Sequence, residues 1–264
     1  MNRNETSRLI SEKDIRPKKS KGQNFLIDER VASRHIAFAG IEKGDSVLEV
    51  GPGLGILTEK LIEACDNVTA IELDEKLADH IESEYGERLK LIRGDALSIP
   101  FPKFDRFVSN LPYSISTPII FKLLNYNFKK AVVMVQKEFA ERMVAGRGEV
   151  DYSRLTVNVY YRAECRILEN VPASRFKPRP KVDSSLVEIV PRPSPFKVKS
   201  EELFFRVVDA GFVHRRKKIR SALRTEGIVI PEGADVPFLD DRMEILSPED
   251  IGKLSDAIYE SGKI

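Results

Sequence analysis

The chain has 264 residues, of which 42% are hydrophobic, and its formal net charge is only +2 at pH 7. This composition excludes a largely disordered chain, and no apolar run approaches the roughly 18 residues of a membrane-spanning helix. The polar N-terminus lacks the apolar core of a signal peptide, and Cys65 and Cys165 form no CxxC pair. We therefore expect a cytoplasmic protein without a membrane or metal partner.

In chain order, residues 1–20 are polar and charged and predict a flexible tail. A helix is expected from Asp28, because aspartate is a favoured N-cap. Beyond it, short apolar segments alternate with helical patterns, and strands are predicted at 46–50, 68–72, 89–95, 104–110 and 130–136. This alternation is typical of right-handed βαβ units, so we predict an α/β, Rossmann-like sheet.

The character of the chain changes after about residue 185. Residues 184–192 predict a further strand, which ends in the proline-rich stretch PRPSPF. Helical patterns follow, and the last of them begins at Ser247 with Pro248 at the first helical position. We therefore predict a Rossmann-like domain over 21–195 and a small helical domain over 196–264.

The segment LEVGPGLG places glycines at 51, 53 and 55 between a strand and a helix. Glycines let the backbone approach a ligand closely. A dinucleotide fold prefers GxGxxG, whereas here the spacing is GxGxG and Glu49 comes just before the loop. An acidic residue at this position favours a cationic ligand such as S-adenosylmethionine over a pyrophosphate.

Two later strand ends also carry carboxylates. Glu72 closes the second strand and can accept hydrogen bonds from both hydroxyls of a ribose. Asp95 follows the third strand in the sequence GDAL and can accept from the exocyclic amine of a cofactor's adenine. Because the carboxyl ends of parallel strands share one edge of a sheet, we expect a single site there.

The fourth strand ends in Asn110-Leu111-Pro112-Tyr113. An adenine amine is a poor nucleophile because its lone pair is delocalised, and acceptors on both of its protons can redirect that lone pair. We expect the Asn110 oxygen and the Leu111 carbonyl to be these acceptors. Pro112 favours an extended Leu111 and adds no N–H group, and Tyr113 offers a face for stacking a flipped base. Methyl transfer would then need neither a metal nor a nucleophilic side chain.

Basic residues are concentrated in three clusters, which predict a polyanionic partner. The clusters are Arg16, Lys18, Lys19 and Lys21; Arg175, Lys177, Arg179 and Lys181; and Arg215, Arg216, Lys217, Lys218, Arg220 and Arg224. The three histidines are scattered, and we expect structural or surface roles for them rather than metal binding.

These motifs together resemble one known family. GQNFL at 22–26, the GPGLG loop, Glu72, GDAL, NLPY and VPASRFKPRPKVDSS are similar to the rRNA adenine dimethyltransferases, and most similar to their small-subunit (KsgA/Dim1) branch. The likeness runs from about Lys18 to the C-terminal helices. The basic FKPRPK segment and the short C-terminal domain look more archaeal than bacterial.

The resemblance implies a class I S-adenosylmethionine-dependent methyltransferase with a small helical RNA-binding domain. Its expected reaction is dimethylation of two adjacent adenosines in a hairpin loop near the 3′ end of small-subunit rRNA, in the assembling subunit, by a monomer. Cofactor contacts are implied for Asn24, Leu26, Gly51, Gly53, Glu72, Asp95 and Asn110. Contacts with the RNA substrate are implied for Tyr113, Phe176, Arg215, Arg216, Lys217 and Lys218.

Three alternatives stay open from the sequence. The sister branch methylates a single adenine of large-subunit rRNA and confers macrolide resistance, although the GQNFL and PKVDS segments favour the small-subunit branch. A ribosome-assembly factor with little catalysis is another possibility, against which the intact NLPY and cofactor loop argue. A DNA adenine methyltransferase is the weakest alternative, because those enzymes more often have a second proline where Leu111 stands.

Overall fold

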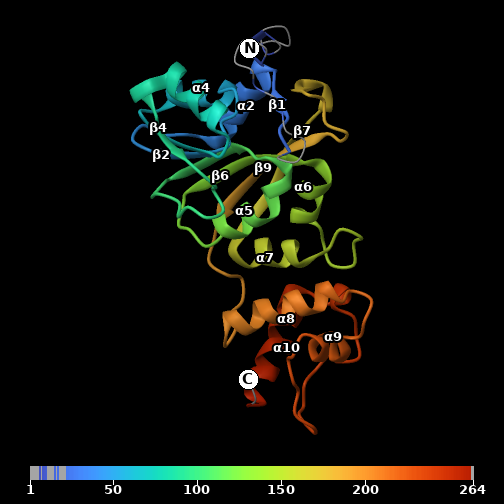
Figure 1. Cartoon of the computed structure of the whole chain (residues 1–264). Coiled ribbons are helices and arrows are strands. Elements are labelled where there is room, and N and C mark those ends of the chain that lie inside the picture. The colour runs from blue at the N-terminus through green and yellow to red at the C-terminus, as the bar shows by residue number, and fades with distance from the viewer. Residues whose placement is uncertain (1–5, 7, 11–14, 16, 18–21, 263–264) are drawn as a thin grey trace. The chain divides into compact units, whose positions relative to one another are not determined.

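A computed structural model describes residues 6, 8–10, 15, 17 and 22–262 of the chain (Figure 1). Contacts between residues divide the chain into two compact units. The first comprises Met1–Ala140 and Glu164–Pro191, and the second comprises Glu141–Ala163 and Arg192–Ile264. Within the described ranges, every helix is too short or too polar to span a bilayer.

The first unit is built on a seven-stranded sheet with the order β4-β3-β2-β5-β6-β9-β7 (Figure 1). The neighbours from β4 through β6 are parallel, whereas β9 runs antiparallel to β6. The predicted α/β, Rossmann-like sheet is therefore confirmed. Its strands are β2 (Ser46–Val50), β3 (Asn67–Glu72), β4 (Lys90–Arg93), β5 (Arg106–Asn110), β6 (Lys130–Gln136), β7 (Ala163–Val171) and β9 (Ser184–Pro191).

Three helices and one face of the sheet form a common core, in which Leu61 and Ile81 pack with Val68, Val108 and Val132. The helices are α2 (Glu29–Ala39), α3 (Ile56–Ala64) and α4 (Glu75–Tyr85), and a short 3-10 turn, η2 (Gly86–Arg88), follows the last of them. The N-terminus of α2 is capped as predicted, because the Asp28 carboxylate accepts the Arg30 N–H at 2.9 Å. These apolar contacts fix the helices against the sheet, and so they also fix the loops that follow the carboxyl ends of the strands.

The opposite face of the sheet is covered by aromatic and branched side chains. Phe107 alternates with Val108 along β5, and its ring lies 5.9 Å from that of Phe101 and 6.0 Å from that of Phe104. Helix α5 (Ser116–Leu123) follows the turn η3 (Tyr113–Ile115), and its Ile119 and Leu123 are completely buried. The chain that leaves β5 is thus held firmly within the domain.

A two-stranded ladder joins distant parts of the first unit. β1 (Phe25–Leu26) pairs antiparallel with β8 (Phe176–Lys177), which follows the turn η4 (Ala173–Arg175). Ile15 is buried against Phe25 and Leu54, and the flexible tail over 1–20 stays a prediction. The reason for this burial is hydrophobic, since Ile15 removes its side chain from water beside the glycine loop. The predicted basic cluster at 16–21 lies outside the described residues.

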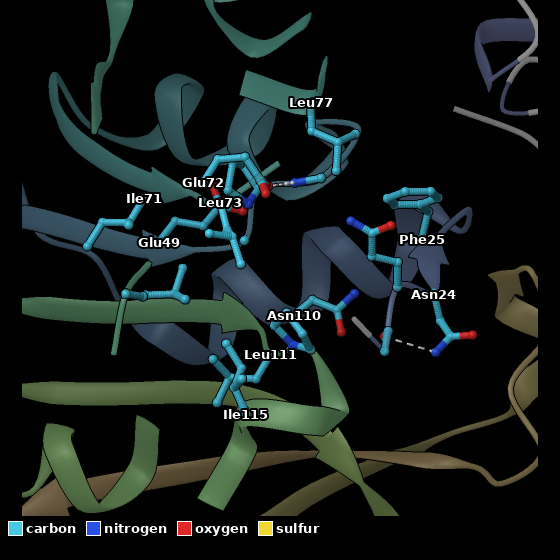
Figure 2. A pocket seen from close by; sticks show the side chains of 18 of the residues that line it. Asn24, Phe25, Glu49, Ile71, Glu72, Leu73, Leu77, Asn110, Leu111 and Ile115 are labelled. Carbon is cyan, nitrogen blue, oxygen red and sulfur yellow. Dashed lines mark hydrogen bonds between the residues drawn. The ribbon is translucent and has the colours of Figure 1, made fainter. Parts of the chain in front are cut away.

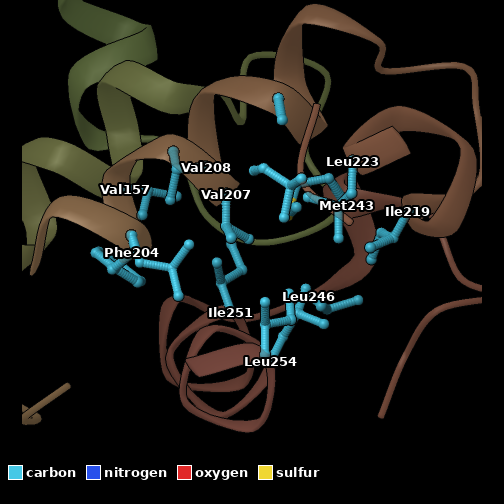
Figure 3. Close-up of a cluster of buried hydrophobic side chains, with 14 of the residues drawn as sticks. Val157, Phe204, Val207, Val208, Ile219, Leu223, Met243, Leu246, Ile251 and Leu254 are labelled. Carbon is cyan, nitrogen blue, oxygen red and sulfur yellow. The ribbon is translucent and has the colours of Figure 1, made fainter. Parts of the chain in front are cut away.

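The second unit is helical and has its own core, in which Val157 meets Phe204, Val207 and Ile251 (Figure 3). Its elements are α7 (Arg154–Arg162), α8 (Glu201–Val213), α9 (Ile219–Thr225), η5 (Met243–Ile245) and α10 (Pro248–Glu260), and α6 (Lys137–Val144) spans the division between the units. Ser247 caps α10 as predicted, because its hydroxyl accepts the Asp250 N–H at 3.1 Å.

The division between the units differs from the predicted boundary at 195/196. Residues 141–163 belong with the C-terminal helices, although they precede β7 in the chain. The physical reason is that Tyr152, Val157 and Tyr161 bury their side chains in the same core as α8 and α10. The chain crosses between the units three times, at 140/141, 163/164 and 191/192, and the proline-rich linker marks only the last of these crossings. The other two carried no comparable signal.

Two of the histidines and both cysteines are buried or partly buried. His35 is completely buried and its Nε2 lies 2.8 Å from the Val132 carbonyl oxygen, and burial lowers the pKa of His35 to about 4. His80 is buried on α4. Cys65 and Cys165 are free thiols, and burial raises the pKa of each. These groups therefore serve the fold.

Candidate active site

A cavity of about 340 Å³ lies at the carboxyl ends of β2, β3 and β5 (Figure 2). Its lining brings together segments that are far apart in sequence: 22–26, 49–54, 56–57, 71–73, 94–97 and 110–115, with Leu77. Every residue predicted for cofactor contact, and all four residues of the NLPY motif, lie in this lining. The structure therefore assembles one candidate site from motifs that the sequence presents separately.

The glycine loop allows two aromatic rings to pack tightly against its backbone. Gly55 has φ 86°, and a Cβ there would lie 2.5 Å from the hydroxyl oxygen of Tyr85, which donates to the Gly55 carbonyl at 3.0 Å. Gly53 has φ 60°, and a Cβ there would lie 3.1 Å from the Phe25 ring. A side chain at either position would be strained in conformation and would also push an aromatic ring away.

Glu72, at the end of β3, ties the glycine loop to the sheet. Its carboxylate accepts the Asp74 N–H at 2.8 Å and the Gly53 N–H at 3.3 Å. The side chain is almost completely buried, and this burial raises the pKa of its carboxyl group. Each carboxylate oxygen has two lone pairs, so Glu72 can hold the loop and still accept hydrogen bonds from a ligand in the cavity.

Glu49 places a second carboxyl group in the cavity lining, at 1% exposure. Within the described residues its hydrogen-bond partner is the Thr58 hydroxyl, which donates to it at 2.7 Å. Burial raises the pKa of Glu49 to about 8; the Thr58 hydrogen bond opposes this shift, and the charge of nearby Glu72 adds to it. Glu49 is therefore mainly protonated at neutral pH, and a cation in the cavity would favour its ionised form.

The loop that carries Asp95 is held by a lysine that sequence reasoning missed. Asp95 accepts the Leu97 N–H at 2.9 Å, which closes a tight turn. The Lys122 ammonium group, on α5, donates to the carbonyls of Ala96, Leu97 and Ile99 at 2.7, 3.2 and 2.5 Å. Lys122 thus links this loop to the helix that follows the NLPY turn. A single lysine in a helical pattern has no spacing signal by which it could have been found.

Asn110 ends β5 at the rim of the cavity. Within the described part of the chain its side-chain amide makes no hydrogen bond, which leaves both its oxygen and its nitrogen available to a ligand. The next residue, Leu111, donates its N–H to the Met134 carbonyl at 3.1 Å and so anchors the turn to β6. A polar group held rigidly yet without a partner is suited to ligand recognition.

The expectation that Phe176 contacts the target base stays a prediction. Phe176 is 1% exposed, is absent from the cavity lining, and packs with Val31, Met134 and Leu186. It lies opposite Leu26 in the β1–β8 ladder. Burial of the Phe176 ring also supports the strand that carries Leu26.

The basic residues expected to contact RNA lie in the second unit and outside the lining of the cavity. Arg215 pairs with Glu244 at 2.6 Å, and Lys218 pairs with Asp240 at 3.2 Å. The Lys217 ammonium group donates to the Thr225 hydroxyl at 3.2 Å. Arg216 makes no ion pair or hydrogen bond within the described part of the chain.

Comparison with known proteins places these features in a family. A family model described as ribosomal RNA adenine dimethylase matches residues 15–253. The chain belongs to the ribosomal RNA adenine dimethylase family. This match covers the candidate site and most of the second unit, and it confirms the family resemblance inferred from the motifs.

Archaeal members of the adenine dimethylase family are similar over most of their length. A probable ribosomal RNA small subunit methyltransferase A of Methanosarcina acetivorans is 44% identical, over 90% of this chain and 92% of its own. A protein of the same name from Pyrococcus furiosus is 40% identical, over 97% of each chain.

Solved structures of two further methyltransferases resemble this adenine dimethylase family member. A dimethyladenosine transferase from Plasmodium falciparum has a TM-score of 0.76 and 32% identity, with 90% of this chain and 98% of that one covered. The 23S rRNA methyltransferase ErmE has a TM-score of 0.66 and 27% identity, with 89% and 100% covered. The class I methyltransferase fold is confirmed.

Proposed function

We propose that this chain uses S-adenosylmethionine to dimethylate the exocyclic amines of two adjacent adenosines in a hairpin loop near the 3′ end of small-subunit rRNA, in the assembling subunit. The observation that carries the proposal is the free amide of Asn110, held at the cavity rim beside Leu111, Pro112 and Tyr113. The names of the archaeal relatives support small-subunit rRNA as the substrate.

The cavity fits a cationic, adenosine-containing cofactor. Glu49 offers a buried carboxyl that a positive charge can ionise, and Glu72 offers acceptors for ribose hydroxyls. Asp95 lies in the lining on the turn held by Lys122, where it can accept from an adenine amine. S-adenosylmethionine, when bound, supplies a methyl group on a sulfonium. Asn24, Leu26, Gly51, Gly53 and Asn110 complete the proposed contacts.

The residues after β5 would act on the target adenine by positioning it. The Asn110 oxygen and the Leu111 carbonyl accept the two protons of the amine, which redirects the nitrogen lone pair toward the methyl group. Pro112 keeps the turn extended, with φ −56° and ψ 127°. Tyr113 presents a ring on which the base stacks. Catalysis of this kind rests on orientation and electrostatics and requires no covalent intermediate on the enzyme.

In this proposal the second unit contributes to binding of rRNA. Arg216 has no ion-pair partner in the described residues, and Arg215, Lys217 and Lys218 hold their partners at the surface, where such pairs are weak and exchange readily with phosphates. These contacts would position the RNA without reading its sequence. The large-subunit alternative is less favoured, because ErmE is less similar than the dimethyladenosine transferase in both TM-score and identity.

The proposed reaction can be tested directly on its substrate. Immature small subunits and large subunits are incubated separately with the enzyme and labelled S-adenosylmethionine, and modified adenines are mapped by blocked primer extension. Label at two adjacent adenines of small-subunit rRNA is the expected result. Label in large-subunit rRNA alone would assign the chain to the other branch, and particle binding without any label would support a noncatalytic assembly factor.

Cofactor affinity should rise with pH because of Glu49. The pKa of Glu49 is about 8, so at lower pH a cationic ligand must displace its proton, which weakens binding by up to about tenfold per pH unit. We expect affinity to rise from pH 6 to pH 8 and then level off. Calorimetry in buffers of different ionisation enthalpy should detect one released proton at pH 7.

Glu49→Gln provides the matched variant for this measurement, because it keeps the size of the side chain and removes the titration. We expect it to flatten the pH profile and to bind the cofactor more weakly at pH 8. Adenosine, which is uncharged, serves as the control ligand and should bind with little pH dependence. An equally steep profile in Glu49→Gln would mean that another group carries the titration.

A further inference from the structure

The segment KVDSS at 181–185 is part of a motif shared with the family, yet none of its residues has a role in the proposed reaction. It leads into β9, where Ser184 lies opposite Gln136 of β6 in the antiparallel ladder. The carboxyl end of β6 lies at the same edge of the sheet as the cavity. Ser184 is completely buried, and its Oγ lies 2.7 Å from the hydroxyl oxygen of Tyr113.

Tyr113 is attached to the protein at both ends of its side chain. Its backbone lies in the short turn η3, and its hydroxyl is bonded to Ser184 on the sheet. Burial raises the pKa of Tyr113, so the phenol stays protonated and keeps this hydrogen bond at neutral pH. A ring held at both ends has a defined plane, whereas a ring held only through its backbone can rotate about its side-chain torsions.

The Ser184 end of this contact is itself immobilised. The carbonyl of the preceding residue, Asp183, accepts the Lys137 N–H at 2.9 Å, and the Asp183 carboxylate accepts the Ala173 N–H at 2.8 Å. On the other side of the turn, Gly22 approaches so closely that a Cβ there would lie 3.1 Å from the Tyr113 nitrogen. The tyrosine is therefore supported by the sheet at its hydroxyl and by the GQNFL segment at its backbone.

We propose that Ser184 is a positioning residue, which fixes the plane of the Tyr113 ring so that the target adenine stacks with its amine directed at Asn110. This inference rests on the proposed function, because it assigns Tyr113 to the target base. Ser184 does not line the cavity, so it acts through Tyr113 rather than on the substrate. It also gives the KVDSS segment a role in the reaction.

The test is a double-mutant cycle on methyl transfer to small-subunit rRNA. Ser184→Ala and Tyr113→Phe should each lower turnover by about 3- to 10-fold, the range expected from loss of one neutral hydrogen bond. The double variant should be no slower than either single variant, because both remove the same contact. Cofactor affinity should be unchanged in all three. Additive losses, or a parallel loss of cofactor affinity, would overturn the proposal.

Ser185→Ala is the matched control. Ser185 is the next residue of β9, is equally buried, and donates its hydroxyl to the Asn170 side-chain oxygen at 2.8 Å. Its hydroxyl is bonded to Asn170 and not to Tyr113, so its loss should alter stability as much as Ser184→Ala does while leaving turnover intact. If both variants lose turnover equally, the effect of Ser184 is merely structural.

A second readout does not depend on activity. The chain has seven tyrosines and no tryptophan, so fluorotyrosine labelling gives a small set of fluorine NMR signals, and Tyr113→Phe identifies the one from Tyr113. Ser184→Ala should shift this signal and Ser185→Ala should not. An unshifted signal would refute the positioning role even in an active enzyme. An unmethylated rRNA with a shifted signal would reject the proposed function and leave Ser184 as the residue that orients Tyr113.

Discussion

Asn110→Ala is expected to lower the turnover of methyl transfer by roughly 100- to 1000-fold, the range measured when one preorganised polar group is removed from an active site. The side-chain amide of Asn110 has no other partner within the described residues, so its oxygen is free to accept a proton of the target amine. Without it the adenine lone pair stays delocalised in the ring. Single-turnover methylation at saturating S-adenosylmethionine measures the loss.

Two variants sharpen the measurement on Asn110. Asn110→Asp keeps an acceptor oxygen at the same place and should retain more activity than Asn110→Ala. Asn127→Ala removes an exposed asparagine outside the cavity and should be as active as the unchanged chain. Since Asn110 is also a proposed cofactor contact, some loss of cofactor affinity is expected. A loss of cofactor affinity as severe as the loss of turnover would mean that Asn110 acts through the cofactor and not on the target base.

Glu72→Ala is expected to raise the dissociation constant for S-adenosylmethionine by roughly 10- to 100-fold, the range for loss of hydrogen bonds to a charged group. Two effects act in the same direction. The ribose hydroxyls lose their acceptor, and the N–H groups of Gly53 and Asp74 lose the carboxylate that ties the loop to β3. Turnover should largely recover when the cofactor is supplied in excess.

Isothermal calorimetry with S-adenosylmethionine provides the measurement for Glu72, and Glu59→Ala provides the control. Glu59 is an exposed acid in the first turn of α3, near the loop but outside the cavity lining, so its loss should leave affinity unchanged. A Glu72→Ala protein that binds the cofactor normally would remove Glu72 from the site. Circular dichroism of each variant establishes that the fold is retained.

The parallel strands could be predicted because they are buried on both faces. Segments such as SVLEV and KAVVMVQ are short, apolar and rich in β-branched residues, which is the pattern of a central strand. β7 lacks this pattern, because it lies at the edge of the sheet and its sequence AECRILENV mixes charged with apolar residues. The sequence also contained no indication that 141–163 belong to the second unit. Only the long-range packing of Tyr152 and its neighbours determines this assignment.

Residues of the candidate site could be predicted where a polar or charged side chain stands at the carboxyl end of a predicted strand. Glu72 and Asn110 stand at such ends, and their residue types limit what they can bind. Phe176 is less certain from sequence, because an aromatic residue can fill a core as readily as it can stack on a base, and in this structure its ring is buried. Lys122 and Ser184 were missed, since their partners are backbone carbonyls and a tyrosine brought near only by folding.

The pairing of β1 with β8 has a consequence for biosynthesis. Phe25 and Leu26 are made early, but the strand that secures them contains Phe176 and Lys177. A nascent chain that has released only its first 140 residues from the ribosome already holds the five parallel strands and the glycine loop. It still lacks the β1–β8 pairing that holds Phe25 and Leu26 beside the cavity. We therefore expect the enzyme to bind its proposed cofactor only after the second third of the protein has emerged.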